Sequence, residues 1–85
     1  MSVRRKLGVV DSHIDGRLVA LNSEFEFVEL DALGEFIWSQ TTAPTDIDLI
    51  VRAVTSRFEV DPETCRADVT RFLQELHDAQ LIELD

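Results

Sequence analysis

The stretch "SEFEFVELDALGEFIWSQ", residues 23–40, changes its hydrophobic period halfway along. Residues 24–27 alternate acidic with aromatic side chains, and Val28 and Glu29 follow, as in a β-strand with one buried face. From Asp31 onward the apolar side chains follow helical spacing, and a carboxylate at that position can accept from the free amides of a first helical turn. Gly34 within this helix favours close packing of another backbone. A strand that runs directly into a helix is therefore predicted.

A hairpin is predicted before this strand. Asp15-Gly16 separates the apolar-rich runs 9–14 and 17–21. A type I′ turn needs positive φ at both central residues, and Gly adopts it without steric cost. We therefore expect two antiparallel strands over these runs.

The loop into the third strand decides which side chains face each other. A three-residue loop over residues 22–24 places Leu21 opposite Phe25 and Val19 opposite Phe27, which gives one apolar face. A two-residue loop would place glutamates opposite the same aliphatic side chains. The sequence therefore predicts the first register, in a three-stranded antiparallel meander whose third strand lies at the edge.

Three helices are expected after the meander. Pro44 ends the first helix, and Thr45 with Asp48 resembles a capping arrangement for the second. Asp61-Pro62 is a typical start for the third, because proline at the first helical position loses no hydrogen bond. The predicted helices span about 32–40, 46–58 and 62–79.

Strands followed by helices indicate an α+β fold with the helices segregated to one side of the meander. The paired-helix arrangement at the end also suggests a winged-helix relative. We expect one domain over residues 1–85, in which residues 1–8 form a flexible basic start and "LIEL" a short extended tail.

Composition excludes several classes of protein. The net charge is −9, and the three basic residues at positions 4–6 leave the rest of the chain more acidic still, so nucleic-acid binding is disfavoured. Cys65 is the single cysteine, which precludes an intramolecular disulfide and fits the cytoplasm. No apolar run approaches the roughly 18 residues of a membrane helix. We expect a small soluble monomer.

Catalytic and metal-binding patterns are weak. "DSH" at residues 11–13 resembles a triad, but neighbours in a strand point to opposite faces, so Ser12 and His13 cannot share a proton. His77 has no second ligand at metal-binding spacing, and Cys65 lies on an apolar stripe, as a buried thiol does. We predict no enzyme activity, no catalytic residue, no metal site and no cofactor.

The acidic strand edge has two interpretations. In the first, Glu24, Glu26 and Glu29 only keep copies of the protein apart by repulsion. Alternatively, they attract an extended basic peptide that pairs with the free main-chain groups of the edge. The wide apolar arc of the third helix, with Phe72 and Leu73, fits either one wall of such a groove or a buried core helix.

The order of elements resembles the PqqD-like family, the recognition elements for precursor peptides of ribosomally made natural products. The resemblance runs from about residue 17 to residue 84. It rests on the following residues: Leu30, Asp31, Gly34, Ile37 and Trp38 in the first helix region, Val60-Asp61 before the third helix, and Ala67, Asp68, Val69, Phe72, Leu73 and Leu76 within it.

The resemblance implies a non-catalytic adaptor that binds a leader peptide as an added strand against the third strand and third helix. It implies that this adaptor delivers the precursor peptide to a leader peptidase and a macrocyclase, as the free-standing recognition elements of lasso-peptide pathways do. The excess of acidic residues in this chain would suit a leader peptide that is rich in Lys. The residues that it assigns to the peptide are Phe25, Glu26, Phe27, Val28 and Glu29 of the third strand, and Asp68, Val69, Phe72, Glu75 and Leu76 of the third helix.

Two other functions remain open from the sequence. A winged-helix DNA-binding protein would read DNA with its third helix, which is rich in acidic residues here. A structural or dimerising subunit would use the same strand edge for pairing with its own copy.

Overall fold

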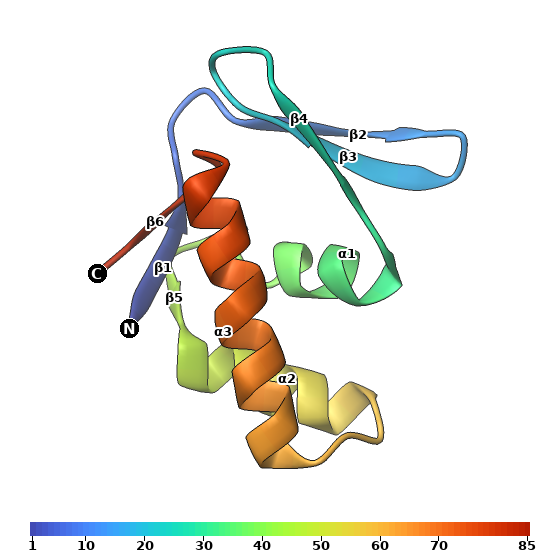
Figure 1. The fold of residues 1–85 in the computed structure, drawn as a ribbon, viewed down its shortest axis with the longest axis vertical. Coiled ribbons are helices and arrows are strands. Elements are labelled where there is room, and N and C mark those ends of the chain that lie inside the picture. Colours follow the sequence, from blue (N-terminus) through green and yellow to red (C-terminus); the bar gives the residue numbers. More distant parts are fainter.

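The computed structural model describes residues 1–85 and shows two small sheets and three helices (Figure 1). No helix combines the length and the apolar character needed to cross a membrane. The elements in chain order are β1 (Ser2–Arg5), β2 (Val10–Ile14), β3 (Arg17–Leu21), β4 (Phe27–Leu30), α1 (Ala32–Ser39), β5 (Thr45–Asp46), α2 (Ile47–Arg57), α3 (Pro62–Asp78) and β6 (Ile82–Leu84).

The predicted meander is present as the antiparallel sheet β2-β3-β4. Asp15 and Gly16 form the tight turn between β2 and β3, with φ angles of 53° and 81°. Both residues therefore adopt the positive φ that a two-residue hairpin turn requires. The α+β class, with the meander ahead of three helices, is confirmed.

The register between β3 and β4 differs from the prediction. Leu21 faces Phe27 and Val19 faces Glu29, so the intervening loop covers residues 22–26 and the strand begins two residues later than expected. Phe25 lies in this loop with a φ of 65°. The shift by two residues keeps the same side chains on the same face of the sheet, because side chains alternate with a period of two.

Asn22 explains the longer loop. Its side-chain Oδ1 accepts from the main-chain N–H groups of Glu24 and Glu26, at 2.9 and 3.0 Å. Its Nδ2 donates to the carbonyl oxygen of Ala79, at the end of α3, at 2.9 Å. Asn22 is only 3% exposed, so these bonds satisfy a buried polar side chain and fix the loop against the helix.

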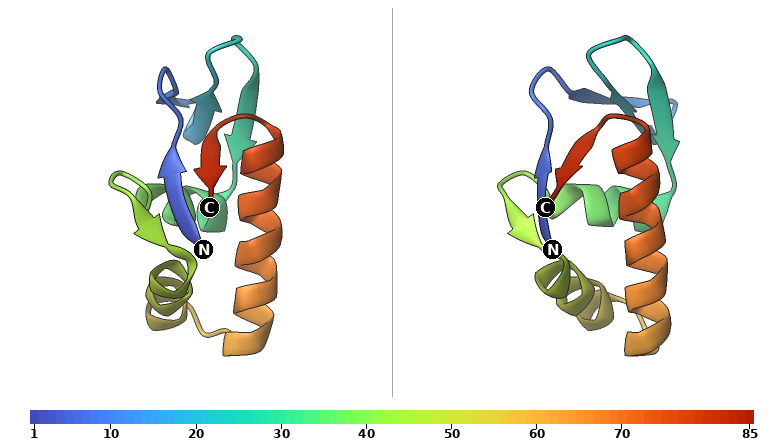
Figure 2. Two further views of the ribbon diagram at one scale, coloured as in Figure 1. Left: turned by 90° about the vertical axis from the view of Figure 1, so that its left-hand side faces the viewer. Right: turned by 60° about the vertical axis from the view of Figure 1, so that its left-hand side comes forward.

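A second sheet, β5-β1-β6, was not predicted. The first residues form its central strand, where a flexible start was expected, and Val3 is fully buried. Arg4 donates to Glu83 of β6. Because β1 is paired on both sides and buries an apolar side chain, residues 2–5 are ordered. The two termini lie close together in this sheet (Figure 2).

Each helix begins at a capping aspartate. Asp31, Asp46 and Asp61 all accept from a main-chain N–H of the following first turn. The cap of α2 is therefore Asp46 and not Thr45, which instead pairs with Val3 in the second sheet. The predicted helix bounds agree with the structure to within one residue at each end.

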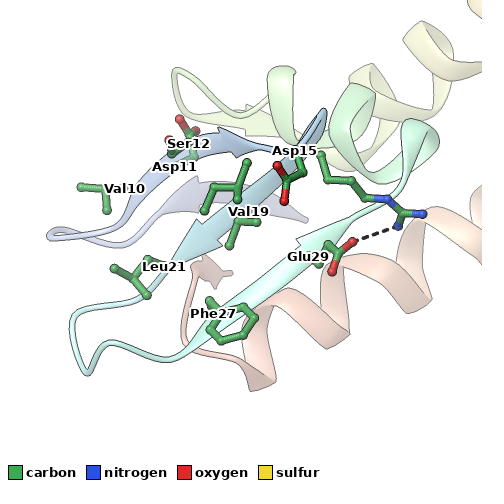
Figure 3. Close-up of a pocket in the computed structure, with 10 residues that line it drawn as sticks. Val10, Asp11, Ser12, Asp15, Val19, Leu21, Phe27 and Glu29 are labelled. Carbon is green, nitrogen blue, oxygen red and sulfur yellow. Dashed lines mark ion pairs between the residues drawn. The ribbon is translucent and has the colours of Figure 1, made fainter.

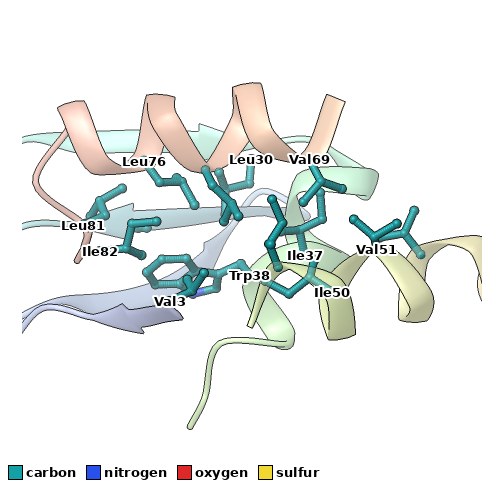
Figure 4. Close-up of a cluster of buried hydrophobic side chains, with 14 of the residues drawn as sticks. Val3, Leu30, Ile37, Trp38, Ile50, Val51, Val69, Leu76, Leu81 and Ile82 are labelled. Carbon is teal, nitrogen blue, oxygen red and sulfur yellow. The ribbon is translucent and has the colours of Figure 1, made fainter. Parts of the chain in front are cut away.

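The core lies where both sheets and all three helices meet (Figure 4). Val69, Leu73 and Leu76 of α3 are at most 1% exposed, so most of the apolar arc of this helix is core. The other fully or almost fully buried large side chains are Val3, Leu30, Ile37, Trp38, Ile50, Val54, Leu81 and Ile82.

Trp38 connects the core to the meander. Its indole Nε1 donates to the Asp11 carboxylate of β2 at 2.7 Å, and the guanidinium carbon of Arg5 lies 3.9 Å from the ring centroid. Arg5 also donates to the Trp38 carbonyl oxygen at 2.6 Å. These contacts join one strand of each sheet to α1, and burial lowers the pKa of the Arg5 guanidinium.

Candidate functional site

A groove runs between the edge strand β4 and helix α3, which lie side by side in Figure 2. It consists of a hollow of about 420 Å³ along the strand and a second of about 200 Å³ between α1 and α3. We call it the β4–α3 groove. Its lining residues are Arg17, Val28, Glu29, Leu30, Asp31, Leu33, Gly34, Ile37, Asp68, Arg71, Phe72 and Glu75.

The main chain of β4 presents free hydrogen-bonding groups along this groove. Asn22 N–H donates to the Glu26 carbonyl oxygen, which makes these two residues a hydrogen-bonded pair. Bonded and non-bonded pairs alternate along an antiparallel ladder. Phe27 and Glu29 therefore fall in non-bonded pairs, and their N–H and C=O groups point away from β3 to the open edge. An extended peptide could pair with these groups.

Phe72 forms the apolar floor where the two hollows meet. A Cβ atom on Gly34 would lie 3.0 Å from the Cζ atom of this ring. Close packing at Gly34 thus involves a side chain of α3, and not another backbone as expected. The glycine leaves room for the ring atoms next to α1. Phe72 remains only partly buried, so a ligand can reach it.

The charges around the groove are mostly acidic. Asp68 pairs with Arg71 at 3.1 Å, and Glu29 pairs with Arg17 at 3.1 Å. Glu75 is exposed, lines both hollows, and makes no ion pair or side-chain hydrogen bond. An unpaired carboxylate in the middle of the groove favours a ligand that carries Lys or Arg there.

The structure brings together half of the residues that the sequence assigned to peptide binding. Those that line the groove are Val28, Glu29, Asp68, Phe72 and Glu75. Leu76 was expected to line the cleft, and this is wrong, because its side chain is in the core together with that of Val69. Phe25 and Glu26 belong to the loop before β4, and the Phe27 side chain is 68% exposed on the other face of the sheet.

Several lining residues were not anticipated. Arg71 is three residues from Asp68 on α3, and this spacing for an ion pair could have identified it. No sequence pattern identified Arg17 or Leu33 as lining residues, because their positions depend on how the hairpin and α1 pack against α3.

Residues with catalytic potential lie elsewhere and apart. His13 contacts Glu35 of α1 through its Nε2 atom at 2.9 Å, whereas Ser12 lines a hollow on the opposite face of the sheet. Cys65 is 2% exposed, and burial raises the pKa of its thiol, which disfavours the nucleophilic thiolate. No group of three or more His, Cys, Asp or Glu side chains is placed to hold a metal ion.

Comparisons with known proteins agree on one family. Residues 17–82 match the family model described as coenzyme PQQ synthesis protein D (PqqD). No curated protein sequence matches the chain. The solved structure of TbiB1 in complex with the TbiA(beta) leader peptide is 32% identical, with a TM-score of 0.85 and 94% of each chain covered. A lasso peptide synthetase B1 complexed with the leader peptide shares the fold, at 16% identity, with a TM-score of 0.83 and coverage of 96% of this chain and 98% of that one.

Proposed function

Because the chain belongs to the PqqD family, we propose that it is a non-catalytic adaptor that binds the leader segment of a ribosomally synthesised precursor peptide. The leader binds as an extended strand added to the open edge of β4, with side chains that enter the β4–α3 groove. A similar chain of known structure is itself complexed with a leader peptide, which supports this choice of ligand.

The observation that carries the proposal is the coincidence of an open strand edge with a partly apolar groove. The main-chain groups of Phe27 and Glu29 offer directional hydrogen bonds, and Phe72 offers an apolar contact next to them. Strand addition uses this combination, since main-chain bonds give affinity and side-chain pockets give specificity.

The adaptor would serve enzymes that act on the precursor. By holding the leader and docking on a leader peptidase and a macrocyclase, it raises the effective concentration of the peptide near their active sites. The match to a lasso peptide synthetase B1 supports the lasso-peptide class of pathway. The excess of carboxylates in the groove favours a leader with basic residues.

An amide-shift titration tests this function. The isotope-labelled protein is titrated with the leader of the precursor peptide encoded beside it. We expect shifts at residues 27–31 and 68–75 that saturate at one peptide per chain. A folded protein that shows no shifts with its own leader would refute leader binding, and shifts confined to other elements would refute the groove.

The Phe72 ring should contribute more to leader affinity than the exposed carboxylate of Glu24, which lies in the loop before β4. We expect Phe72→Ala to weaken binding about tenfold or more, because partly buried aromatic anchors dominate interface energetics. Glu24→Ala should change affinity less than about threefold, since it removes only an exposed charge outside the groove. Calorimetric titration of both variants measures this difference, and circular dichroism checks that Phe72→Ala is folded. Equal losses would contradict the anchor role of Phe72.

Glu75 should determine how leader binding responds to salt. We expect Glu75→Gln to slow association and to flatten the dependence of affinity on ionic strength, because it removes the unpaired carboxylate from the groove. Glu63→Gln is the matched control, since it makes the same change in net charge on the same helix at a residue outside the groove. Stopped-flow binding at low and high salt measures the effect. Identical salt slopes in the two variants would show that Glu75 has no specific role.

A further inference from the structure

The loop between β3 and β4, residues 22–26, lies at one end of the open edge of β4. Figure 3 shows this loop between Leu21 and Phe27. Asn22 is its single buried residue, at 3% exposure, whereas residues 23–26 are exposed. Burial of a polar side chain is costly unless its hydrogen bonds are satisfied, so the bonds of Asn22 show what it holds in place.

Asn22 holds three consecutive main-chain N–H groups of the loop. Its Oδ1 atom accepts from Glu24 and Glu26, and its own carbonyl oxygen accepts from Phe25 at 3.1 Å. These donors are therefore already paired and offer nothing to an added strand. The first N–H group after the loop that points to the open edge is that of Phe27. Asn22 thus sets the point at which the open edge begins.

Asn22 also ties the loop to α3, the other wall of the β4–α3 groove. Its Nδ2 atom donates to the carbonyl oxygen of Ala79, the C-cap residue of α3, at 2.9 Å. The last carbonyl groups of a helix have no partner within the helix, so this bond supplies a missing donor. It fixes the beginning of β4 relative to the helix that carries Phe72.

The apolar pattern of β4 fits a second register equally well. With Leu21 opposite Phe25, the same side chains would lie on the same faces of the sheet. This register would displace β4 along β3 by two residues, or about 7 Å. It would also move Glu26 opposite the residue before Leu21, too far for its N–H to reach the side chain of Asn22. The bond between Glu26 and Asn22 therefore favours the observed register, with Leu21 opposite Phe27.

We propose that Asn22 selects the register of β4 that binds the leader, and is thereby a positioning residue for it. The inference rests on the proposed function, because the leader is the strand that pairs with the edge that Asn22 sets. In the observed register the free groups of Phe27 and Glu29 lie along the same groove as Phe72. Asn22 is buried, so it acts through the main chain of β4 without touching the leader. An edge that is ordered in advance spares the leader the cost of ordering it.

Two substitutions of Asn22 and one matched control test this role. Asn22→Ala removes every side-chain bond and should leave the two registers in competition. Asn22→Ser is milder, because its hydroxyl can still accept from a loop N–H but is too short to reach Ala79, and it carries the test if the alanine variant does not fold. Thr41→Val is the control. Thr41 is the other buried polar residue, at 1% exposure, and lies outside the groove, so its substitution should lower stability without changing the register.

Nuclear magnetic resonance measures the register without the leader. Facing residues of a non-bonded pair lie about 4.5 Å apart from Cα to Cα, which gives a strong contact between their Hα protons. The native chain and Thr41→Val should show this contact between Leu21 and Phe27 alone. Both Asn22 variants should also show it between Leu21 and Phe25. Folded Asn22 variants with only the native contact would overturn the proposal.

Calorimetric titration with the leader measures the consequence for binding. If the competent register is populated to about one tenth, the leader should bind about tenfold more weakly, because affinity scales with that population. We expect this loss for Asn22→Ala, a smaller loss for Asn22→Ser, and a change of less than about twofold for Thr41→Val. An equal loss in Thr41→Val would show that general destabilisation is the cause, and would overturn the proposal.

The native chain separates this inference from the proposed function. If it binds its leader and the Asn22 variants bind the leader equally well, the role of Asn22 is refuted and the proposed function stands. If it does not bind its leader, the proposed function is refuted together with any role of Asn22 toward the leader.

Discussion

Replacing Glu29 by Pro is expected to remove most of the leader affinity while the protein stays folded. The N–H of Glu29 points to the open edge, so proline at this position takes no hydrogen bond from the β3–β4 ladder. Proline is tolerated on edge strands for this reason. A leader strand added at this edge, in contrast, would lose the hydrogen bond from the Glu29 N–H and would clash with the pyrrolidine ring. We expect a loss of at least about tenfold in affinity, measured by calorimetric titration with the leader.

Glu29→Ala is the control for this substitution. It removes the same carboxylate and its ion pair with Arg17, which joins two exposed side chains, but it keeps the main-chain N–H. Its effect on affinity should therefore be small. If the alanine variant lost as much affinity as the proline variant, the side chain and not the main chain of β4 would make the decisive contact, and strand addition at this edge would be wrong.

Replacing Trp38 by Ala should have the largest effect on stability. Trp38 is 1% exposed in the core, and truncation of a buried tryptophan costs about 3–5 kcal/mol. The Asp11 carboxylate would also lose its indole donor, and Arg5 would lose the ring on which it stacks. Because folded domains are stable by only about 5–15 kcal/mol, the variant should lose a large fraction of its free energy of unfolding.

Urea denaturation followed by circular dichroism measures this loss without relying on tryptophan fluorescence. Phe25→Ala is the control, since Phe25 is an aromatic residue that is 83% exposed, and its removal should shift the midpoint little. A Trp38→Ala protein as stable as the control would mean that Trp38 does not hold the meander and the core together.

Elements with strong local signals could be predicted from the sequence. The starts of α1 and α3 were located because Asp31 and Asp61 precede apolar periodic runs, and the hairpin was located because Asp15-Gly16 favours positive φ. The start of α2 was located to within one residue, although its cap is Asp46 and not Thr45. The family was recognised from the order of the elements and the spacing of residues between Leu30 and Leu76, and the match of residues 17–82 to the family model confirms it. Each of these features depends on residues that are close together along the chain.

The candidate site was only half predictable for the same reason. Asp68, Phe72 and Glu75 were assigned through the family resemblance, and all three line the groove. Periodicity alone did not show which part of the apolar arc of α3 is covered, so Leu76 was wrongly assigned to the cleft. Nor did it show that the apolar side chains of β2 remain uncovered on the side of the sheet away from the core.

The sequence by itself determined the order of the meander and the three helices, the caps of α1 and α3, and the family. Tertiary structure decided the register of β4, because Asn22 folds the preceding loop against the end of α3, 57 residues away. It also ordered residues 2–5, which gain their strand partners only when β5 and β6 come together on either side. These features depend on hydrogen bonds between distant segments, which no local pattern encodes.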